Sequence, residues 1–390
     1  MPKRVLLVPD GMADEPQAAL GGRTPLEAAH TPHFDALARG GVVGLVHTIP
    51  AGMPPGSDVG NLSVLGYDPA TVFSGRSPLE AVNIVDLAPD DVSYRCNLVT
   101  VAGGVLTDNT AGHLSNDEAH ACFAALKEAL DDEEFAFYAG VTYRGLMVWH
   151  HGELVPCTPP HDILEQPATG HAPGEAAGEG ASPAAVRLAA LQRRADEVLA
   201  RVRPDTNAWF WGEGRRPQMP LFHDLYGLSG AVVGAVDLVR GIGRLAGLDV
   251  VDVPGATGDL DTDYGAKARA AIAALEDHDL VWVHVEAPDE ASHMGDVGEK
   301  IRAIERIDAE VLGRVQAMSP RPAVMVLPDH PTPCALRTHT AEPVPFAISE
   351  SLPGSGGGGA MSYGESEAAD TGLVVAGGAD LMRLFLEATG

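Results

Sequence analysis

Six aspartate and histidine side chains follow short apolar runs that are typical of buried β-strands. They are Asp10 after residues 5–8, Asp289 and His293 after residues 280–285, Asp329 and His330 after residues 323–327, and His339 beyond them. A single aspartate after a strand usually forms a turn or caps a helix. A set of carboxylates and imidazoles at one edge of a sheet instead suits Mn²⁺, Zn²⁺, Mg²⁺ or Co²⁺. The pattern therefore predicts a metal site.

The segment around Ser57 predicts a site for an anion. Pro54-Pro55-Gly56 precedes this serine, and an apolar, helix-like run follows it. Backbone N–H groups at a helix N-terminus favour an anion such as phosphate. The alternative is that Ser57 only caps the helix. If two metal ions lie next to Ser57, a role as nucleophile is favoured. One ion would activate the hydroxyl, and the second would stabilise a transferring phosphoryl group.

Several cationic side chains in the middle of the chain and one near its end suit an anionic substrate. The candidates are Arg76, Arg144, Arg215, Arg216, His113 and Lys267. Most of the arginines adjoin glycine, which permits close approach to phosphate or carboxylate. Ordinary ion pairing with an acidic surface is the alternative for the arginines. For Lys267 the alternative is a solvated position on an alanine-rich helix.

The elements that must position these residues alternate between strand and helix near both ends of the chain. Apolar runs predict strands at 4–8, 42–49, 280–285, 323–327 and 373–376, and helices at 31–39 and 298–318. This alternation is typical of a mainly parallel sheet covered by helices on both faces. Ligands of such sheets bind at the carboxyl ends of the strands, where the candidate metal ligands lie.

The middle of the chain predicts a second domain. A hairpin is expected over 95–107 and a polar helix over 116–130. We therefore expect a discontinuous α/β core formed by residues 1–74 and 244–390, with a smaller α/β domain inserted at 75–243. Glycine-rich stretches at 168–183 and 353–362 predict surface loops.

Composition excludes several classes of partner. The 390 residues include 26 basic and 54 acidic side chains, a formal net charge of −28 that repels nucleic acid and anionic lipid. The four cysteines form no C-x-x-C pair, so a disulfide framework and a thiolate zinc site are not expected. No apolar run reaches membrane length, and neither a P-loop nor a G-x-G-x-x-G motif is present. We expect a cytoplasmic protein without a nucleotide cofactor.

Motifs along nearly the whole chain carry a family resemblance. They include Pro9-Asp10-Gly11, PGSDVGNLSVLGYDP, FSGRSPLEA, DNTAGHLS, VEAPDEASHMGD, Asp329-His330 and His339. The chain resembles the alkaline phosphatase superfamily and, more narrowly, the cofactor-independent phosphoglycerate mutases of the archaeal type. The resemblance implies an alkaline-phosphatase-like α/β core whose mainly parallel sheet is sandwiched by helices.

The resemblance also implies two divalent ions of the Mn²⁺ class, with Zn²⁺, Co²⁺ and Mg²⁺ as alternatives. One ion would be held by Asp289, His293 and His339, and the other by Asp10, Ser57, Asp329 and His330. Ser57 would be the nucleophile. The six cationic candidates named above, His113, Arg144, Arg215, Lys267, Arg76 and Arg216, would contact a small phosphorylated substrate.

The implied reaction is the interconversion of 3-phosphoglycerate and 2-phosphoglycerate through a phosphoserine, a step of glycolysis. The stretches TPPHDI and WFWGEGRRP resemble a bacterial branch that has also been proposed to act as homoserine kinase. A homoserine-kinase-like phosphotransferase and a phosphatase therefore stay open as alternatives. A non-catalytic binding protein would have lost the nucleophile or part of the metal set, and here all seven positions are filled.

Overall fold

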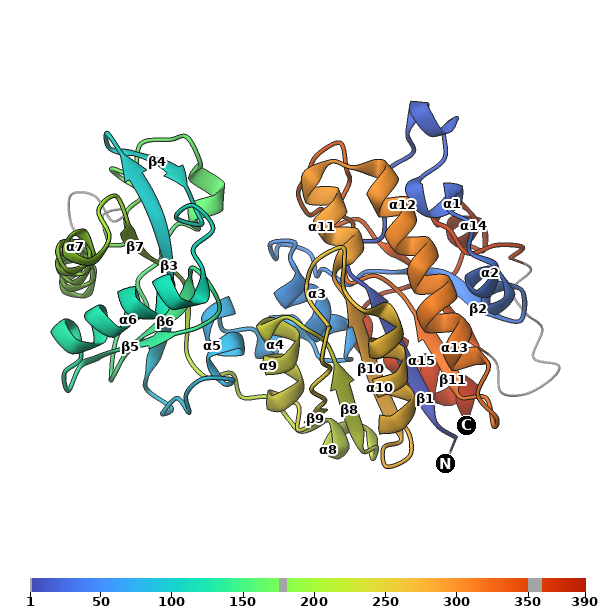
Figure 1. Cartoon of the computed structure of the whole chain (residues 1–390). Helices are drawn as coiled ribbons and strands as arrows, with labels where there is room; N and C mark the ends of the chain where they lie inside the picture. Colours follow the sequence, from blue (N-terminus) through green and yellow to red (C-terminus); the bar gives the residue numbers. More distant parts are fainter. Residues whose placement is uncertain (1, 175–180, 350–359) are drawn as a thin grey trace. The chain divides into compact units, whose positions relative to one another are not determined.

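The computed structural model describes residues 2–174, 181–349 and 360–390 (Figure 1). The chain forms two compact units, one made of residues 1–73 and 219–390 and the other of residues 74–218. The two glycine-rich loops expected from the sequence fall partly on residues 175–180 and largely on 350–359, which lie outside the described residues.

The second crossing between the units differs from the expectation. The chain returns to the first unit at Met219 and not at residue 244. The reason is that β8 (Gly230–Val233) pairs in parallel with β10 (Leu280–Val285) of the first unit. The two crossing segments are tied together within the second unit, where the Ser74 hydroxyl donates a hydrogen bond of 2.6 Å to the Arg215 carbonyl.

The first unit contains an eight-stranded sheet in the order β13-β2-β12-β11-β1-β10-β8-β9. The strands not yet given are β1 (Arg4–Pro9), β2 (Gly41–Val46), β9 (Asp249–Val250), β11 (Ala323–Val326), β12 (Val344–Ser349) and β13 (Val374–Val375). Only β12 runs antiparallel to its neighbours. The predicted mainly parallel sheet is therefore confirmed, although β12 was not among the predicted strands.

Helices cover both faces of this sheet, as predicted. They are α1 (Pro25–Ala28), α2 (Pro32–Arg39), α3 (Ser57–Val64), α4 (Pro69–Val72), α8 (Phe222–Tyr226), α9 (Asp237–Leu245), α10 (Tyr264–Ala274), α11 (Ala287–Met294), α12 (Val297–Arg306), α13 (Gly313–Gln316), α14 (Glu365–Asp370) and α15 (Gly378–Thr389). The long helix expected at 298–318 is divided by a π-helical stretch, η3 (Ile307–Leu312).

Side chains of the central strands alternate between the two faces. Val5 and Leu7 of β1 and Val281 and Val283 of β10 join one apolar core with residues of α2, α10, α12 and η3. His284 lies next in β10 and so points to the opposite face, where α9 packs. Every residue of both strands is buried, which explains why they read as continuous apolar runs.

The three central strands end at the same edge of the sheet. Pro9 at the end of β1 pairs with Val285 at the end of β10, and Leu7 of β1 pairs with Val326 at the end of β11. All three strands are parallel, so the residues that follow them emerge side by side. This edge is where the sequence placed the candidate metal ligands.

The second unit is built on an antiparallel sheet of five strands. Its elements are α5 (Arg76–Ala81), β3 (Val92–Ala102), β4 (Val105–Asp108), α6 (Asn116–Leu130), β5 (Phe135–Ala139), β6 (Arg144–Trp149), α7 (Pro183–Val202) and β7 (Asn207–Gly214). The predicted hairpin and the predicted polar helix are confirmed as β3–β4 and α6. A capping box at Ser115 and Glu118 fixes the first turn of α6.

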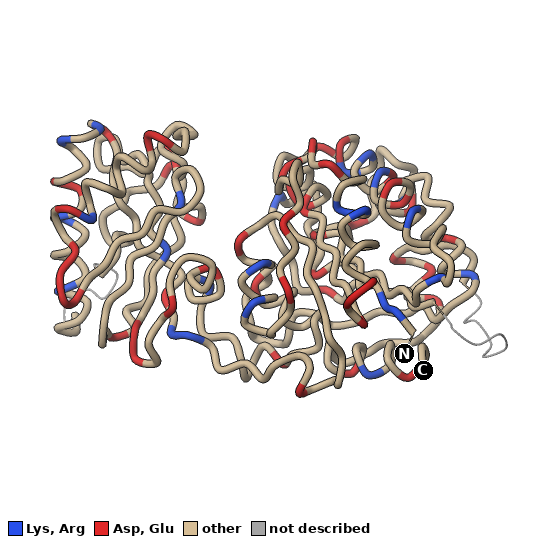
Figure 2. The backbone as a smooth tube through the Cα atoms, turned by 60° about the horizontal axis from the view of Figure 1, so that its bottom comes forward, with Lys and Arg blue, Asp and Glu red and all other residues tan. Residues whose placement is uncertain are grey.

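The distribution of charged residues and the lengths of the apolar helices agree with what the sequence predicts. Figure 2 shows acidic residues along the chain in both units, more numerous than the basic ones, as the net charge of −28 requires. Among the helices formed by the described residues, none is long and apolar enough to cross a membrane.

Candidate active site

The first group of candidate ligands forms around Asp289. Helix α11 carries Asp289 and His293 one turn apart, so that His293 Nε2 lies 3.1 Å from Asp289 Oδ2. The loop after β11 brings His339 Nε2 to 3.6 Å from Asp289 Oδ1 and to 3.1 Å from His293 Nε2. Two imidazole nitrogens and two carboxylate oxygens therefore converge on one space.

The hydrogen bonding of His293 identifies which of its nitrogens carries the lone pair. Its Nδ1 lies 3.0 Å from the carbonyl oxygen of Arg337, which only accepts, so Nδ1 carries the hydrogen. When Nε2 is deprotonated, a lone pair faces the Asp289 carboxylate. A proton on Nε2 relieves this contact, and the hydrogen bond to Asp289 raises the pKa of His293 to about 9. A metal ion at the same place would take over the role of that proton.

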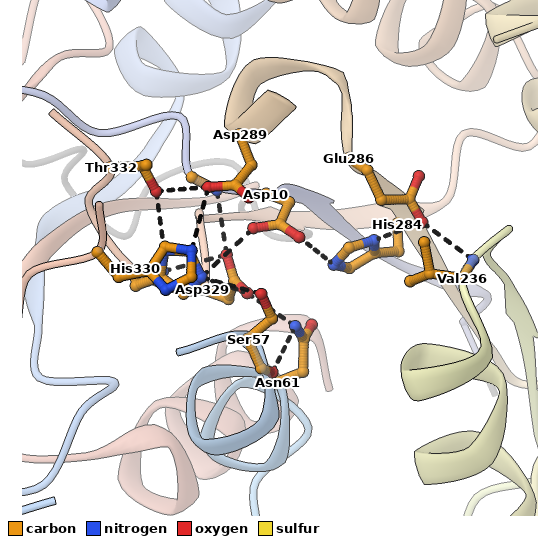
Figure 3. A network of polar contacts seen from close by, with 12 residues as sticks. Asp10, Ser57, Asn61, Val236, His284, Glu286, Asp289, Asp329, His330 and Thr332 are labelled. Atoms are coloured by element: carbon orange, nitrogen blue, oxygen red, sulfur yellow. Dashed lines mark hydrogen bonds and ion pairs between the residues drawn. The ribbon is translucent and has the colours of Figure 1, made fainter. Parts of the chain in front are cut away.

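The second group forms around the buried side chain of His330. Its Nε2 lies 3.1 Å from Ser57 Oγ, 3.4 Å from Asp329 Oδ2 and 3.5 Å from Asp10 Oδ1 (Figure 3). Asp329 and His330 are fully buried, and Asp10 is 4% exposed. The structure thus brings together all seven residues expected to hold metal ions, in two adjacent groups.

Three residues to which the sequence analysis assigned no role orient this group. The Thr332 hydroxyl donates to Asp289 Oδ1 at 2.6 Å and therefore accepts from His330 Nδ1 at 3.1 Å, which leaves the Nε2 lone pair toward Ser57. Asn61 Nδ2 donates to Asp329 Oδ2 at 2.7 Å. The backbone N–H of Gly11 donates to Asp329 Oδ1 at 3.2 Å.

Ser57 is the first residue of α3 and does not cap it. Gly56 occupies the cap position, and no side chain makes a capping hydrogen bond there. The Ser57 hydroxyl is instead directed at His330, and Asp58 Oδ1 accepts a hydrogen bond of 2.8 Å from the Val59 N–H in the same helical turn. This arrangement is the one expected of a nucleophile next to an anion site.

The donor set fits divalent cations. In the described part of the chain, the ion pairs of Asp10, Asp289 and Asp329 are all with histidines and none with lysine or arginine. Burial, together with the charges of Asp329 and Asp289, raises the pKa of Asp10 well above its usual range, and Asp10 Oδ1 has no hydrogen-bond partner among the described residues. A cation satisfies these carboxylates, and their oxygens with imidazole nitrogens suit Mn²⁺, Zn²⁺, Mg²⁺ or Co²⁺.

The distances between possible ligand atoms add His284 to the seven residues that were expected to hold metal ions. Two groups have ligand atoms within 4.8 Å of one another: Asp289 with His330 and His339, and Asp10 with His284 and Asp329. His284 was missed because it lies inside the apolar run of β10, where a histidine reads as part of the core.

Lys267, which the sequence analysis expected to contact substrate, is paired within the first unit. Its side chain is fully buried, and Nζ donates to Glu286 Oε2 at 2.7 Å and to the His284 carbonyl at 3.1 Å. The Lys267 ammonium group overcomes the effect of burial and holds the pKa of Glu286 well below its usual range. Lys267 is thus part of the support behind β10.

The second unit groups Arg76 with an arginine that the sequence analysis missed. Arg76 Nε and Arg95 Nε each lie 3.1 Å from a different oxygen of Glu80. Arg95 is buried and its guanidinium lies 4.4 Å from the centre of the Trp211 ring. Two guanidinium groups therefore lie around one carboxylate, and a cluster of cations of this kind suits an anion.

The other expected substrate residues of the second unit have separate surroundings. Arg144 is exposed and donates to the Tyr143 hydroxyl at 3.2 Å. Arg215 donates to the carbonyls of Gly152 and Asp90, and Arg216 pairs with Asp86. His113 lies exposed in the loop after β4, with φ of 54°. Of these four, Arg144 acts electrostatically on Glu80 and Arg95.

Relatives of known family match the whole chain. A model of the 2,3-bisphosphoglycerate-independent phosphoglycerate mutase family matches residues 38–203. A probable 2,3-bisphosphoglycerate-independent phosphoglycerate mutase from Geobacter sulfurreducens is 47% identical over 99% of this chain and 100% of its own length. An enzyme of the same name from Methanothrix thermoacetophila is 45% identical over 98% of this chain and 99% of its own.

Solved structures agree with these matches. A protein from Pyrococcus horikoshii aligns with a TM-score of 0.81 and 28% identity over 99% of this chain and 97% of its own. The cofactor-independent phosphoglycerate mutase from Thermoplasma acidophilum aligns with a TM-score of 0.66 and 25% identity over the full length of both chains. The resemblance inferred from the motifs is confirmed: this chain belongs to the 2,3-bisphosphoglycerate-independent phosphoglycerate mutase family.

Proposed function

We propose that this chain interconverts 3-phosphoglycerate and 2-phosphoglycerate, a step of glycolysis and gluconeogenesis, by way of a phosphorylated Ser57 and without 2,3-bisphosphoglycerate. The observation that carries the proposal is the position of Ser57 Oγ. It lies at the start of α3, 3.1 Å from His330 Nε2, beside two groups of carboxylate and imidazole ligands. A hydroxyl so placed is suited to attack phosphorus in a charged, cation-binding site.

For the metals we propose two ions, Mn²⁺ before Zn²⁺, Co²⁺ or Mg²⁺. Asp289, His293 and His339 would hold one, and Asp10, Ser57, Asp329 and His330 the other. When bound, such ions lower the pKa of a hydroxyl and offset the charge of the transferring phosphoryl group. Asn61 and Gly11 keep Asp329 oriented by their hydrogen bonds, and Thr332 does the same for His330.

The residues of the chain can carry out the two phosphoryl transfers of this reaction. Ser57 Oγ attacks phosphorus, the bond from phosphorus to the 3-oxygen of the substrate breaks, and glycerate leaves with that electron pair and takes up a proton. The 2-hydroxyl of the same glycerate then loses its proton and attacks the phosphoserine, and the bond to Ser57 Oγ breaks. Backbone N–H groups of the first turn of α3 stabilise the negative charge on the phosphoryl oxygens in both steps.

For substrate binding we propose the arginines of the second unit. Arg76 and Arg95 both lie at Glu80, and their guanidinium groups suit the carboxylate or phosphate of phosphoglycerate. Arg144, which acts electrostatically on the same Glu80, is proposed with them. Arg215, Arg216 and His113 stay predictions from the sequence.

The test is ³¹P NMR of the purified, Mn²⁺-loaded protein with 3-phosphoglycerate alone. The expected result is the signal of 2-phosphoglycerate, without added bisphosphoglycerate. Release of inorganic phosphate alone would instead identify a phosphatase. No change in the spectrum would contradict the mutase proposal, and ATP with homoserine would then be the next pair of substrates to test.

A further inference from the structure

The side chain of His284 is held in one orientation by its contacts, and the proposed reaction assigns it no role. It is fully buried in β10, opposite Val8 of β1, one residue before the strand ends. Its Nδ1 lies 3.2 Å from Glu286 Oε1, and its Nε2 lies 3.5 Å from Asp10 Oδ2. In Figure 3 the Asp10 carboxylate lies between His330 on one side and His284 on the other.

The surroundings of Glu286 decide which nitrogen of His284 carries the hydrogen. Glu286 is paired with the buried ammonium group of Lys267 at 2.7 Å, and its Oε1 also accepts from the Val236 N–H at 3.4 Å. A carboxylate that is ionised in this way only accepts hydrogen bonds. The hydrogen of a neutral His284 is therefore on Nδ1, and the lone pair of Nε2 points toward Asp10.

This geometry leaves two acceptors facing each other. His284 Nε2 has no hydrogen-bond partner among the described residues, and neither has Asp10 Oδ1 on the far side of the same carboxylate. A lone pair 3.5 Å from a carboxylate oxygen in a buried place is unfavourable unless a proton or a metal cation lies between them. The ligand atoms of Asp10, His284 and Asp329 lie within 4.8 Å of one another, close enough to share one ion.

We infer that His284 is a metal ligand on the Asp10 side of the site, with Glu286 and Lys267 as its buried support. The arrangement has the pattern of a carboxylate–histidine–metal triad, in which a carboxylate accepts the second ring N–H and fixes the imidazole. The donor set then comprises four imidazoles, from His284, His293, His330 and His339. The inference rests on the proposed function only for the presence of divalent ions.

The test is metal binding by the apo protein. Native chain, His284→Gln and Glu286→Gln are stripped with a chelator and titrated with Mn²⁺ alone, with calorimetry for affinity and elemental analysis for stoichiometry. His284→Gln should weaken one binding site by more than about tenfold, and Glu286→Gln should weaken the same site by about 10- to 100-fold. His278→Gln is the matched control, since His278 bonds to Ala274 and Asp249 away from the metal groups and should leave binding unchanged.

A second measurement needs no variant and so does not depend on folding of the variants. The native chain, labelled with ¹⁵N-histidine and loaded with Co²⁺, should show strongly hyperfine-shifted nitrogen signals from four histidines. Signals from three histidines, or unchanged Mn²⁺ affinity and stoichiometry in a folded His284→Gln variant, would overturn the inference. Turnover of 3-phosphoglycerate by the native chain is recorded separately, so that failure of this ligand assignment is distinguishable from failure of the proposed function.

Discussion

Nε2 of His293 lies 3.1 Å from Nε2 of His339, and both nitrogens lie within 3.6 Å of an oxygen of the Asp289 carboxylate. The Nδ1 hydrogen of His293 is already committed to the carbonyl of Arg337. Without a cation this contact is held together by a proton, and with a divalent ion all four ligand atoms become attractive. We therefore expect metal binding to affect both activity and local stability.

Removal of the metal ions should therefore abolish turnover and lower the thermal stability. An ion that binds only the folded chain adds about 2.7 kcal/mol of stability per site at a concentration one hundred times its dissociation constant. Mn²⁺ or Co²⁺ added back to chelator-treated protein should restore activity and the unfolding temperature. Unchanged activity after removal of the metal, verified by elemental analysis, would contradict the assignment of both groups.

Ser57→Ala should lower phosphoglycerate mutase turnover by more than about a thousandfold, because the attacking oxygen is lost. The matched control is Ser63→Ala on the same helix, where the hydroxyl only accepts a hydrogen bond of 3.3 Å from the Gly378 N–H. That control should cost about 1 kcal/mol of stability and keep turnover. Appreciable isomerisation by Ser57→Ala, followed by ³¹P NMR, would refute the phosphoserine route.

Gly11→Ala should weaken metal binding, since the residue lies against the ligands. A Cβ at Gly11 would lie 2.4 Å from Asp289 Oδ1 and 2.6 Å from Thr332 Oγ1, at a backbone φ of +61°. Gly21→Ala is the matched control, because Gly21 has a similar φ of +70° with nothing within 4 Å of the added carbon. Calorimetric titration with Mn²⁺ should show at least about tenfold weaker binding for Gly11→Ala. Equal affinities in the two variants would show that the close approach is unimportant.

Lys300→Met should destabilise the first unit strongly. The ammonium group is fully buried and donates to Asp14 Oδ2 at 2.9 Å and to the carbonyls of Ala13 and Thr332. Removing one partner of a buried pair costs about 3–5 kcal/mol. Lys127→Met, at an exposed lysine on α6, should change the stability by less than about 1 kcal/mol. Denaturant unfolding of the two variants checks both values, and a loss below about 1 kcal/mol for Lys300→Met would argue against the prediction.

Glu365 should make the chain less stable as the pH rises from about 4.5 to about 7. Burial raises the pKa of this carboxyl from 4.5 to about 7, so in that range the folded chain keeps a proton that the unfolded chain releases. Glu365→Gln has no proton to lose and can still bond to the Asp14 N–H and the Thr24 hydroxyl. Its free energy of unfolding relative to the native chain should therefore rise across this range, by on the order of 1–3 kcal/mol.

The comparison with Glu365→Gln is made as a difference at each pH. Both chains contain the same histidines and metal ligands, so titration of those groups cancels. The exposed Glu153→Gln serves as the control and should follow the native profile. A flat difference between Glu365→Gln and the native chain from pH 4.5 to pH 7 would show that Glu365 titrates alike in the folded and unfolded chains.

The sequence was sufficient to bring the candidate metal ligands to one edge of the sheet because parallel strands end together. The apolar runs in the sequence show where β1, β10 and β11 end. Because these strands are parallel, the residues that follow them lie close together at one edge of the sheet. The glycine turn before Ser57 made it possible to predict that this serine lies at the start of a helix. The family motifs then supplied the residue roles, which stay predictions until they are tested.

What the sequence could not supply is side-chain direction within buried strands. His284 and Arg95 lie inside apolar strands, and only the alternation of faces and the position of partners from distant segments reveal what they contact. The buried ion pair of Lys267 could not be predicted for the same reason, since its partner Glu286 comes from another element. Strand β12 and the membership of β8 depend on pairing between residues far apart in the chain, which a local pattern does not encode.

The hydrogen bond between Ser74 and Arg215 has an evolutionary consequence. It joins the outgoing and returning segments of the second unit to each other, while all seven expected metal ligands, Ser57 among them, belong to the first unit. The second unit is thus connected to the first by two chain segments that are hydrogen-bonded to each other. Insertions and deletions between Ser74 and Arg215 would therefore change the second unit during evolution and leave its two connections to the first unit at the same spacing.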